Sequence, residues 1–123
     1  MSFAAARDAV TDVFAAVDAA IYDYVPPMVA GPSIFVFPND PYVEFRTPGL
    51  SRVMLNLRLT ALVPYIDGQA ALDNLETLII DILSVIPSGW QIGPVSAPSI
   101  TSVGPSNCLV SEMTVTVATA LGD

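Results

Sequence analysis

Residues Ser51–Val63 have the sequence SRVMLNLRLTALV, in which side chains of two kinds alternate. The first kind is apolar without exception: Val53, Leu55, Leu57, Leu59, Ala61 and Val63. The second kind is mixed: Arg52, Met54, Asn56, Arg58, Thr60 and Leu62. Because successive side chains of a β-strand point to opposite faces of the sheet, this alternation predicts a long strand with one face in the core. The other face, with two arginines near its centre, suits an interface between subunits as well as it suits solvent.

Two other segments have the spacing of amphipathic helices. The first, Ser2–Tyr22, ends before a proline pair and places on one face Val10, Val13, Phe14, Val17 and Ile21. The second, Gly68–Ile86, follows Asp67, which is a good N-cap residue, and is closed by Pro87. Its apolar stripe consists of Leu72, Leu75, Ile79, Ile82, Leu83 and Ile86, widened by Leu78 and Ile80.

Short extended segments make up most of the remaining chain. Strands are predicted at Ser33–Phe37, Tyr42–Arg46, Trp90–Val95 and Leu109–Ala120. Turns are predicted at Pro38–Pro41 and Thr47–Leu50, and Pro94–Asn107, rich in Ser, Pro and Gly, is predicted to be a loop. This order of elements predicts one α+β domain over residues 1–123. Two helices pack on one face of a mostly antiparallel sheet of about four to five strands.

The composition is unusually apolar for a chain of this size. Hydrophobic residues make up 53% and charged residues 13% of its 123 residues, against about 45–50% and about 25% in typical domains. A small domain cannot bury so much apolar material in its own core, so we expect part of it in contacts between subunits. A membrane is not expected to take it up, because prolines and glycines interrupt the charge-free stretch Ile82–Ser111. Asp8 and Asp12 argue against a signal peptide, so synthesis in a cytoplasm is expected.

The net charge of −8 argues against binding to the phosphates of nucleic acid. The only cations are Arg7, Arg46, Arg52 and Arg58, and the chain has no lysine and no histidine. Histidine is the commonest general base and metal ligand, so its absence argues against an enzyme and against a metal site. The single cysteine, Cys108, excludes an internal disulfide and is expected to be a buried small apolar residue.

The carboxylates give little support for catalysis or for a cofactor. Asp8 and Asp12, and Asp73 and Glu76, are pairs at helical spacing, which solvated helix faces explain better than acid–base chemistry does. Asn39, Asp40 and Glu44 carry oxygen ligands that suit calcium but lack the glycine-containing ligand pattern of an EF-hand loop. We therefore expect no cofactor.

Six residues are candidates for a subunit or ring interface: Tyr42, Glu44, Arg46, Arg52, Arg58 and Trp90. A hairpin turn between Arg46 and Arg52 would bring these two arginines together, with Glu44 close by, and Arg58 lies further along the strand. In a chain with so few cations, acidic groups of the same or a neighbouring subunit are natural partners, although exposed local ion pairs explain the pattern equally well. The aromatic candidates suit core or interface packing.

The chain also resembles a known family over nearly its whole length. The resemblance is carried by the element order and by SIFVFPNDPYVEF, RVMLNLRLTALVP, DGQAALDNLETLI, IPSGW and SEMTVTVAT. These features resemble the tail terminator, or tail completion, proteins of phages with long, non-contractile tails. The lysine-free composition is similar to that of phages of actinobacterial hosts.

The resemblance implies a structural protein of the virion, assembled in the host cytoplasm. It implies a ring, usually a hexamer, at the head–tail junction. The ring stops polymerisation of the tail tube and joins the tube to the head-completion and connector proteins. DNA would pass through the lumen without specific binding, which suits an acidic chain.

Other assignments compete with this one. Within the virion, the chain could be another neck component, such as a stopper or head-closure protein, or a tail-tube subunit. From a different class, it could be a dimeric bacterial module that binds a small ligand or acts as a scaffold.

Overall fold

A computed structural model describes residues 3–29, 31–44, 52–65 and 68–120. In chain order its elements are α1 (Phe3–Val13), the short 3-10 helix η1 (Phe14–Ala16), β1 (Ala20–Tyr22), β2 (Ser33–Glu44), β3 (Arg52–Pro64), α2 (Gly68–Val85), β4 (Gln91–Ile92), β5 (Ser99–Val103) and β6 (Ser106–Ala120). The strands of the described residues form one six-stranded sheet in the order β1-β2-β3-β6-β4, with β5 also paired to β6. All pairs are antiparallel except β1 with β2. The predicted α+β class is confirmed, with one strand more than the upper estimate.

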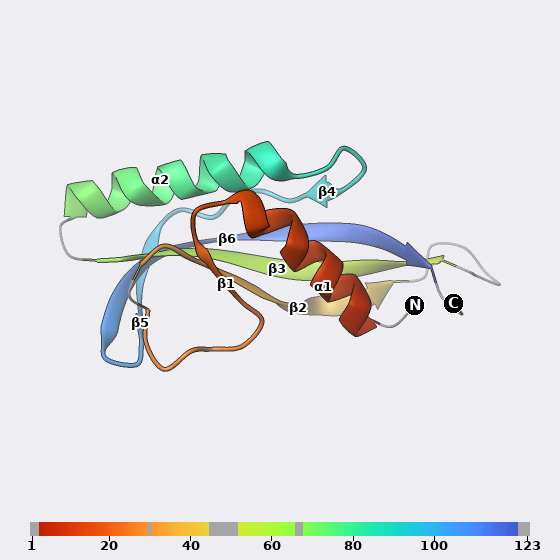
Figure 1. The fold of residues 1–123 in the computed structure, drawn as a ribbon, viewed down its shortest axis with the longest axis horizontal. Coiled ribbons are helices and arrows are strands. Elements are labelled where there is room, and N and C mark those ends of the chain that lie inside the picture. Colours follow the sequence, from red (N-terminus) through yellow and green to blue (C-terminus); the bar gives the residue numbers. More distant parts are fainter. Residues whose placement is uncertain (1–2, 30, 45–51, 66–67, 121–123) are drawn as a thin grey trace.

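Strand β3 is the centre of the sheet and confirms the alternation seen in the sequence. It pairs with β2 on one side and, over its whole length, with β6 on the other. Its six alternating apolar residues, Val53 to Val63, are all at most 1% exposed. Figure 1 shows α2 running lengthwise along the long strands and α1 crossing them obliquely.

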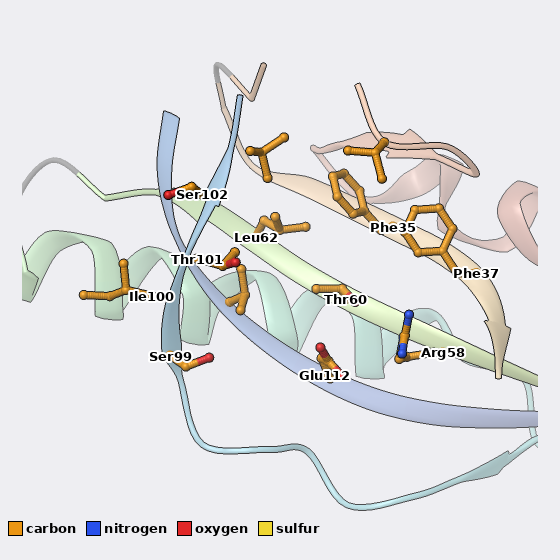
Figure 2. A pocket seen from close by; sticks show the side chains of 13 residues that line it. Phe35, Phe37, Arg58, Thr60, Leu62, Ser99, Ile100, Thr101, Ser102 and Glu112 are labelled. Carbon is orange, nitrogen blue, oxygen red and sulfur yellow. The ribbon is translucent and has the colours of Figure 1, made fainter. Parts of the chain in front are cut away.

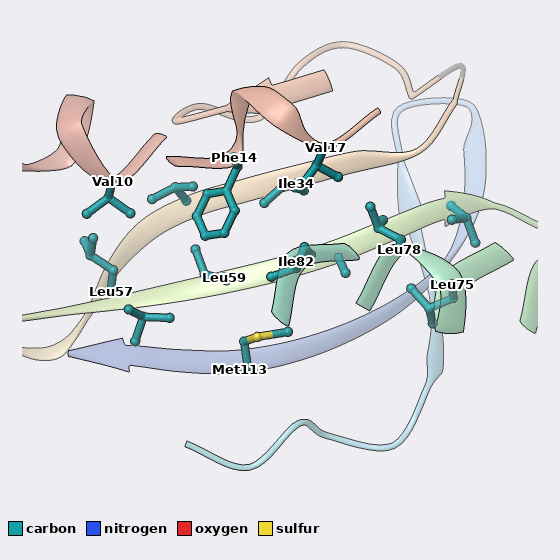
Figure 3. Packing of buried hydrophobic residues seen from close by; sticks show 14 of the residues in the cluster. Val10, Phe14, Val17, Ile34, Leu57, Leu59, Leu75, Leu78, Ile82 and Met113 are labelled. Atoms are coloured by element: carbon teal, nitrogen blue, oxygen red, sulfur yellow. The ribbon is translucent and has the colours of Figure 1, made fainter. Parts of the chain in front are cut away.

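The main core lies between this face of the sheet and the helices. Val10, Phe14 and Val17 reach it from the N-terminal segment, and Ala71, Leu75, Leu78 and Ile82 reach it from α2. Ile34 of β2 and Met113 of β6 complete it beside the β3 residues (Figure 3). Both helices therefore bury their apolar stripes against the same face of the sheet.

The opposite face of the sheet, called here the second face, carries a smaller core. It consists of Val29, Phe35, Leu62, Val103, Cys108 and Val110. The loop before β2 supplies Val29 and β5 supplies Val103, so two segments fold over one end of this face. Cys108 is fully buried there, as expected.

The N-terminal helix is shorter than predicted. The predicted helix Ser2–Tyr22 is α1 and η1 only, and Val17 already has the extended conformation, with φ −83° and ψ 137°. Ala20–Tyr22 then joins the edge of β2 as a parallel strand. The spacing of Val17 and Ile21 suits a helix as well as a strand. The free edge of β2 therefore decides that this segment forms a strand, and the local sequence does not encode that edge.

Strand β2 is continuous where a turn was predicted at Pro38–Pro41. Its pairing with β3 changes register between Pro38 and Val43, so the two prolines lie at an irregularity. The β1 partner covers only Ser33–Phe35, which leaves the proline-containing half of β2 without a strand on that side among the described residues. Prolines are tolerated at such bulges and edges because no ladder hydrogen bond is required of them. The predicted Thr47–Leu50 turn lies outside the described residues.

The predicted loop Pro94–Asn107 contains a strand. Ser99–Val103 forms β5 and pairs with Val110 to Ser106 in a tight hairpin. Gly104 in the turn has a φ of +59°, a conformation that glycine adopts without strain. The predicted strands at Trp90–Val95 and Leu109–Ala120 are found as the shorter β4 and the longer β6.

Helix α2 agrees with its predicted bounds to one residue, while Asp67 lies outside the described residues. The buried stripe is narrower than predicted, since Leu72 is 40%, Ile80 65% and Leu83 42% exposed. A sheet covers only part of the circumference of a helix that packs on it, and the apolar side chains of α2 span a wider arc than the sheet covers.

Candidate functional site

A pocket of about 360 Å³ lies on the second face of the sheet, between β2 and β5. Its floor is buried and apolar, because Phe35, Leu62 and Val110 are only 1–6% exposed. Its rim is exposed at Val25, whose side chain is 66% exposed. Figure 2 shows that the labelled lining residues come from the strands β2, β3, β5 and β6, with Ile100 directed away from the others.

Two charged groups face this pocket, Arg58 from β3 and Glu112 from β6. Arg58 lies opposite Phe37 on one side and Thr114 on the other, and Glu112 lies opposite Thr60. Arg58 is exposed, and its guanidinium has no ion-pair or hydrogen-bond partner among the described residues. The pocket therefore combines apolar walls with one unpaired cation and one carboxylate.

An aromatic row runs beside the pocket on the second face. The ring centroids of Phe35 and Phe37 are 5.5 Å apart, and those of Tyr22 and Phe35 are 5.8 Å apart. Tyr24, which is 60% exposed, continues the row at a centroid distance of 5.6 Å from Tyr22. The row extends the apolar wall from the buried floor to solvent.

Glu44 is held by a buried amide. The Nδ2 atom of Asn56 donates to Glu44 Oε1 at 2.7 Å and to the Pro41 carbonyl at 2.8 Å. The Thr116 hydroxyl donates to Asn56 Oδ1 at 2.8 Å, so this amide ties β2, β3 and β6 together. Glu44 was predicted to lie close to Arg46 and Arg52. Arg46 and the side chain of Arg52 lie outside the described part of the structure.

The two aromatic candidates pack within the subunit. Trp90 is half-buried and meets Phe14 edge to face, with ring centroids 6.4 Å apart. Tyr42 is half-buried against the main core. The structure brings Glu44 and Arg58 to the same face of the sheet and places Trp90 and Tyr42 in other contacts.

A second candidate surface lies on α2, on the other side of the sheet from the pocket. Leu72, Glu76, Ile80 and Leu83, called here the α2 stripe, are all exposed. At 100° per residue these four positions fall within an arc of about 80°, so they form one ridge. Glu76 therefore lies among three exposed apolar side chains. The sequence signal for this ridge was the width of the apolar arc, which exceeds what one sheet can cover.

Cys108 is part of the small core of the second face. Burial raises the pKa of its thiol above the ordinary value because the thiolate would lose its hydration. In the described residues no group of three or more acidic, histidine or cysteine side chains is arranged to hold a metal ion. None of the described helices has the length and hydropathy needed to cross a membrane.

No protein-family model matches the chain, and no curated protein matches it significantly in sequence.

Proposed function

We propose that this protein is a structural subunit of a ring at the head–tail junction of a long-tailed phage. In this role it ends polymerisation of the tail tube and joins the tube to the head connector. The whole-chain resemblance in sequence pattern and element order suggests the family. The exposed apolar surface is the observation that supports an assembly of several subunits.

That surface lies on both sides of the α+β sandwich. The α2 stripe faces outward from the helical layer, and the pocket rim at Val25 is exposed on the second face. Clustered exposed apolar side chains mark contact surfaces, and a subunit flanked by two neighbours covers such surfaces on both of its sides. This distribution favours a closed ring over a pair of subunits.

The charge supports passage of DNA through such a ring. With 12 acidic residues against four arginines, the assembled ring would carry a strongly negative field. A negative lumen repels phosphates, so DNA would slide through without adhering.

The test uses the tail-tube protein of the same phage while it polymerises. Adding the purified chain is expected to stop elongation and to leave one ring at one tube end by electron microscopy. Continued elongation, or incorporation of the chain along the tube wall, would contradict the proposal, and the second result would indicate a tube subunit. Binding only to the portal side of the neck would indicate a stopper or head-closure protein.

The pocket gives one specific reason to keep the binding-module alternative. Its volume lies near the lower end of the range of about 300–1000 Å³ for small-ligand sites. That alternative requires a closed dimer and a ligand that stabilises the isolated subunit. A ring-forming chain requires neither.

A further inference from the structure

We propose that the pocket on the second face receives the α2 stripe of a second copy of this chain. In this contact Glu76 of one copy pairs with Arg58 of the next. The inference deepens the proposed ring and rests on it only in requiring that several copies associate.

The pocket has the character of a protein-docking surface more than that of a small-molecule site. Its buried floor at Leu62 is continuous with a rim at Val25, whose side chain is 66% exposed. Small ligands are usually enclosed, whereas a protein partner covers an apolar rim of this kind. Figure 2 shows Ser99 and Thr101 of β5 directed toward the pocket, whereas Ile100 is directed away from it.

The α2 stripe matches the pocket in its apolar character and in its charge. Leu72, Ile80 and Leu83 present exposed aliphatic side chains at helical spacing, which is how an amphipathic helix enters an apolar groove. Glu76 lies among them as an exposed carboxylate. The pocket offers the complement, which is apolar walls and the Arg58 guanidinium, for which the described residues supply no partner.

Glu112 sets the register of this contact. It is the acidic residue on the pocket lining, on the β6 side, and it repels an incoming carboxylate. Glu76 must therefore lie on the β3 side of the pocket, over Arg58, with the aliphatic side chains directed toward Phe35 and Leu62. Removing the charge of Glu112 should strengthen the contact.

The placement of the two surfaces determines the kind of assembly. The α2 stripe belongs to the helical layer and the pocket to the opposite face of the sheet, so α2 lies behind the sheet in Figure 2. A contact between unlike surfaces on opposite sides is head to tail, and it builds a ring when the rotation closes. Each copy then uses its pocket once and its α2 stripe once.

Charge reversal in two separate chains tests this pairing. Arg58→Glu alone places two carboxylates together, and Glu76→Arg alone places two cations together, so each should raise the concentration needed for assembly by about tenfold or more. Mixing the two variants restores an attractive pair at every interface, provided that the copies alternate. Native mass spectrometry is expected to show assemblies with equal numbers of the two variants.

Asp81→Arg is the matched control. It makes the same charge change on the exposed side of the same helix, but Asp81 lies beside Asn74 and Thr77, away from the α2 stripe. It should assemble like the unmodified protein, and circular dichroism should show the native fold for all variants. Glu112→Gln should lower the concentration needed for assembly.

Several results would overturn the pairing. These are unimpaired assembly of each single variant, equal impairment by Asp81→Arg, a mixture without alternation, and an unmodified protein that stays monomeric at every soluble concentration both with and without tail tubes. If each single variant on its own still forms rings that cap tail tubes, the pairing is wrong and the proposed function stands. If assemblies form by this pairing but never arrest tubes, the proposed function fails instead.

Discussion

A β-carbon on Gly104 would overlap the carbonyl oxygen of Pro27. The β5–β6 turn therefore fits directly against the loop that leads into β2, and both segments contribute to the small core of the second face. In Figure 1 that loop extends from β1 toward β5 before entering β2. This contact fixes one wall of the pocket, so its integrity can be tested by mutation.

Gly104→Ala should lower the free energy of unfolding by about 2–5 kcal/mol. The positive φ costs about 1–2 kcal/mol for a residue with a β-carbon, and the overlap adds about 1–3 kcal/mol. Urea denaturation followed by circular dichroism measures the change. Gly31→Ala is the control, because a β-carbon there meets nothing within 4 Å. If the two variants lose equal stability, the Pro27 contact is not what requires glycine at position 104.

Asn56→Ala should destabilise the protein by about 2–3 kcal/mol. The substitution removes a 5% exposed amide and leaves the Glu44 carboxylate and the Thr116 hydroxyl without this partner, and unsatisfied buried groups carry such a cost. Asn107→Ala, which removes an exposed amide bonded to Ser102, should cost about 0.5 kcal/mol or less. Denaturant midpoints of the two variants make the comparison, and a small loss for Asn56→Ala would show that water replaces the amide.

Ile82→Ala and Ile80→Ala should separate folding from assembly on one helix. Ile82 is 0% exposed and its truncation should cost about 2–5 kcal/mol of stability. Ile80 is 65% exposed, so its truncation should leave the unfolding free energy almost unchanged and weaken self-association. Thermal unfolding and light scattering measure the two effects. Unchanged association in Ile80→Ala would count against the α2 stripe as a contact surface.

Stability should fall as the pH rises above the ordinary pKa of a thiol. The folded state raises the pKa of Cys108, so between the unfolded and folded values the unfolded chain has lost its proton while the native chain keeps it. The contribution of the Cys108 thiol to stability is fully present below the pKa that the thiol has in the unfolded chain. It is lost as the pH rises through the pKa of the thiol in the folded protein. Subtracting the pH–stability curve of Cys108→Ala isolates this effect from the tyrosines. Identical slopes would show that the thiol ionises equally in both states.

Long elements with clear periodicity were predictable, and short ones were not. The alternation in β3 and the stripe of α2 predict those elements within one residue, because strong local patterns agree with the tertiary structure. Strand β1 and strand β5 depend on an available edge of β2 or β6. Their own residues carry no comparable signal, so the first was predicted as helix and the second as loop.

For the candidate site, the sequence predicted only which face of the sheet carries it. Alternation placed Arg58 on the second face from sequence alone, and that placement is confirmed. The pocket was not predictable, because it is formed where β5 and the loop before β2 fold over strands that are distant in sequence. The outward ridge of α2 was present in the sequence as an overly wide apolar arc, and interpreting it required knowing which part of the arc the sheet covers.

The most direct test of a ring at the head–tail junction is the native mass of the purified protein. Mass photometry or light scattering, at several concentrations and with and without tail tubes, makes this measurement. We expect one discrete ring, or a subunit that becomes such a ring when tubes are added. A stable dimer indifferent to tail tubes, or open-ended tubes formed by the chain alone, would contradict the account.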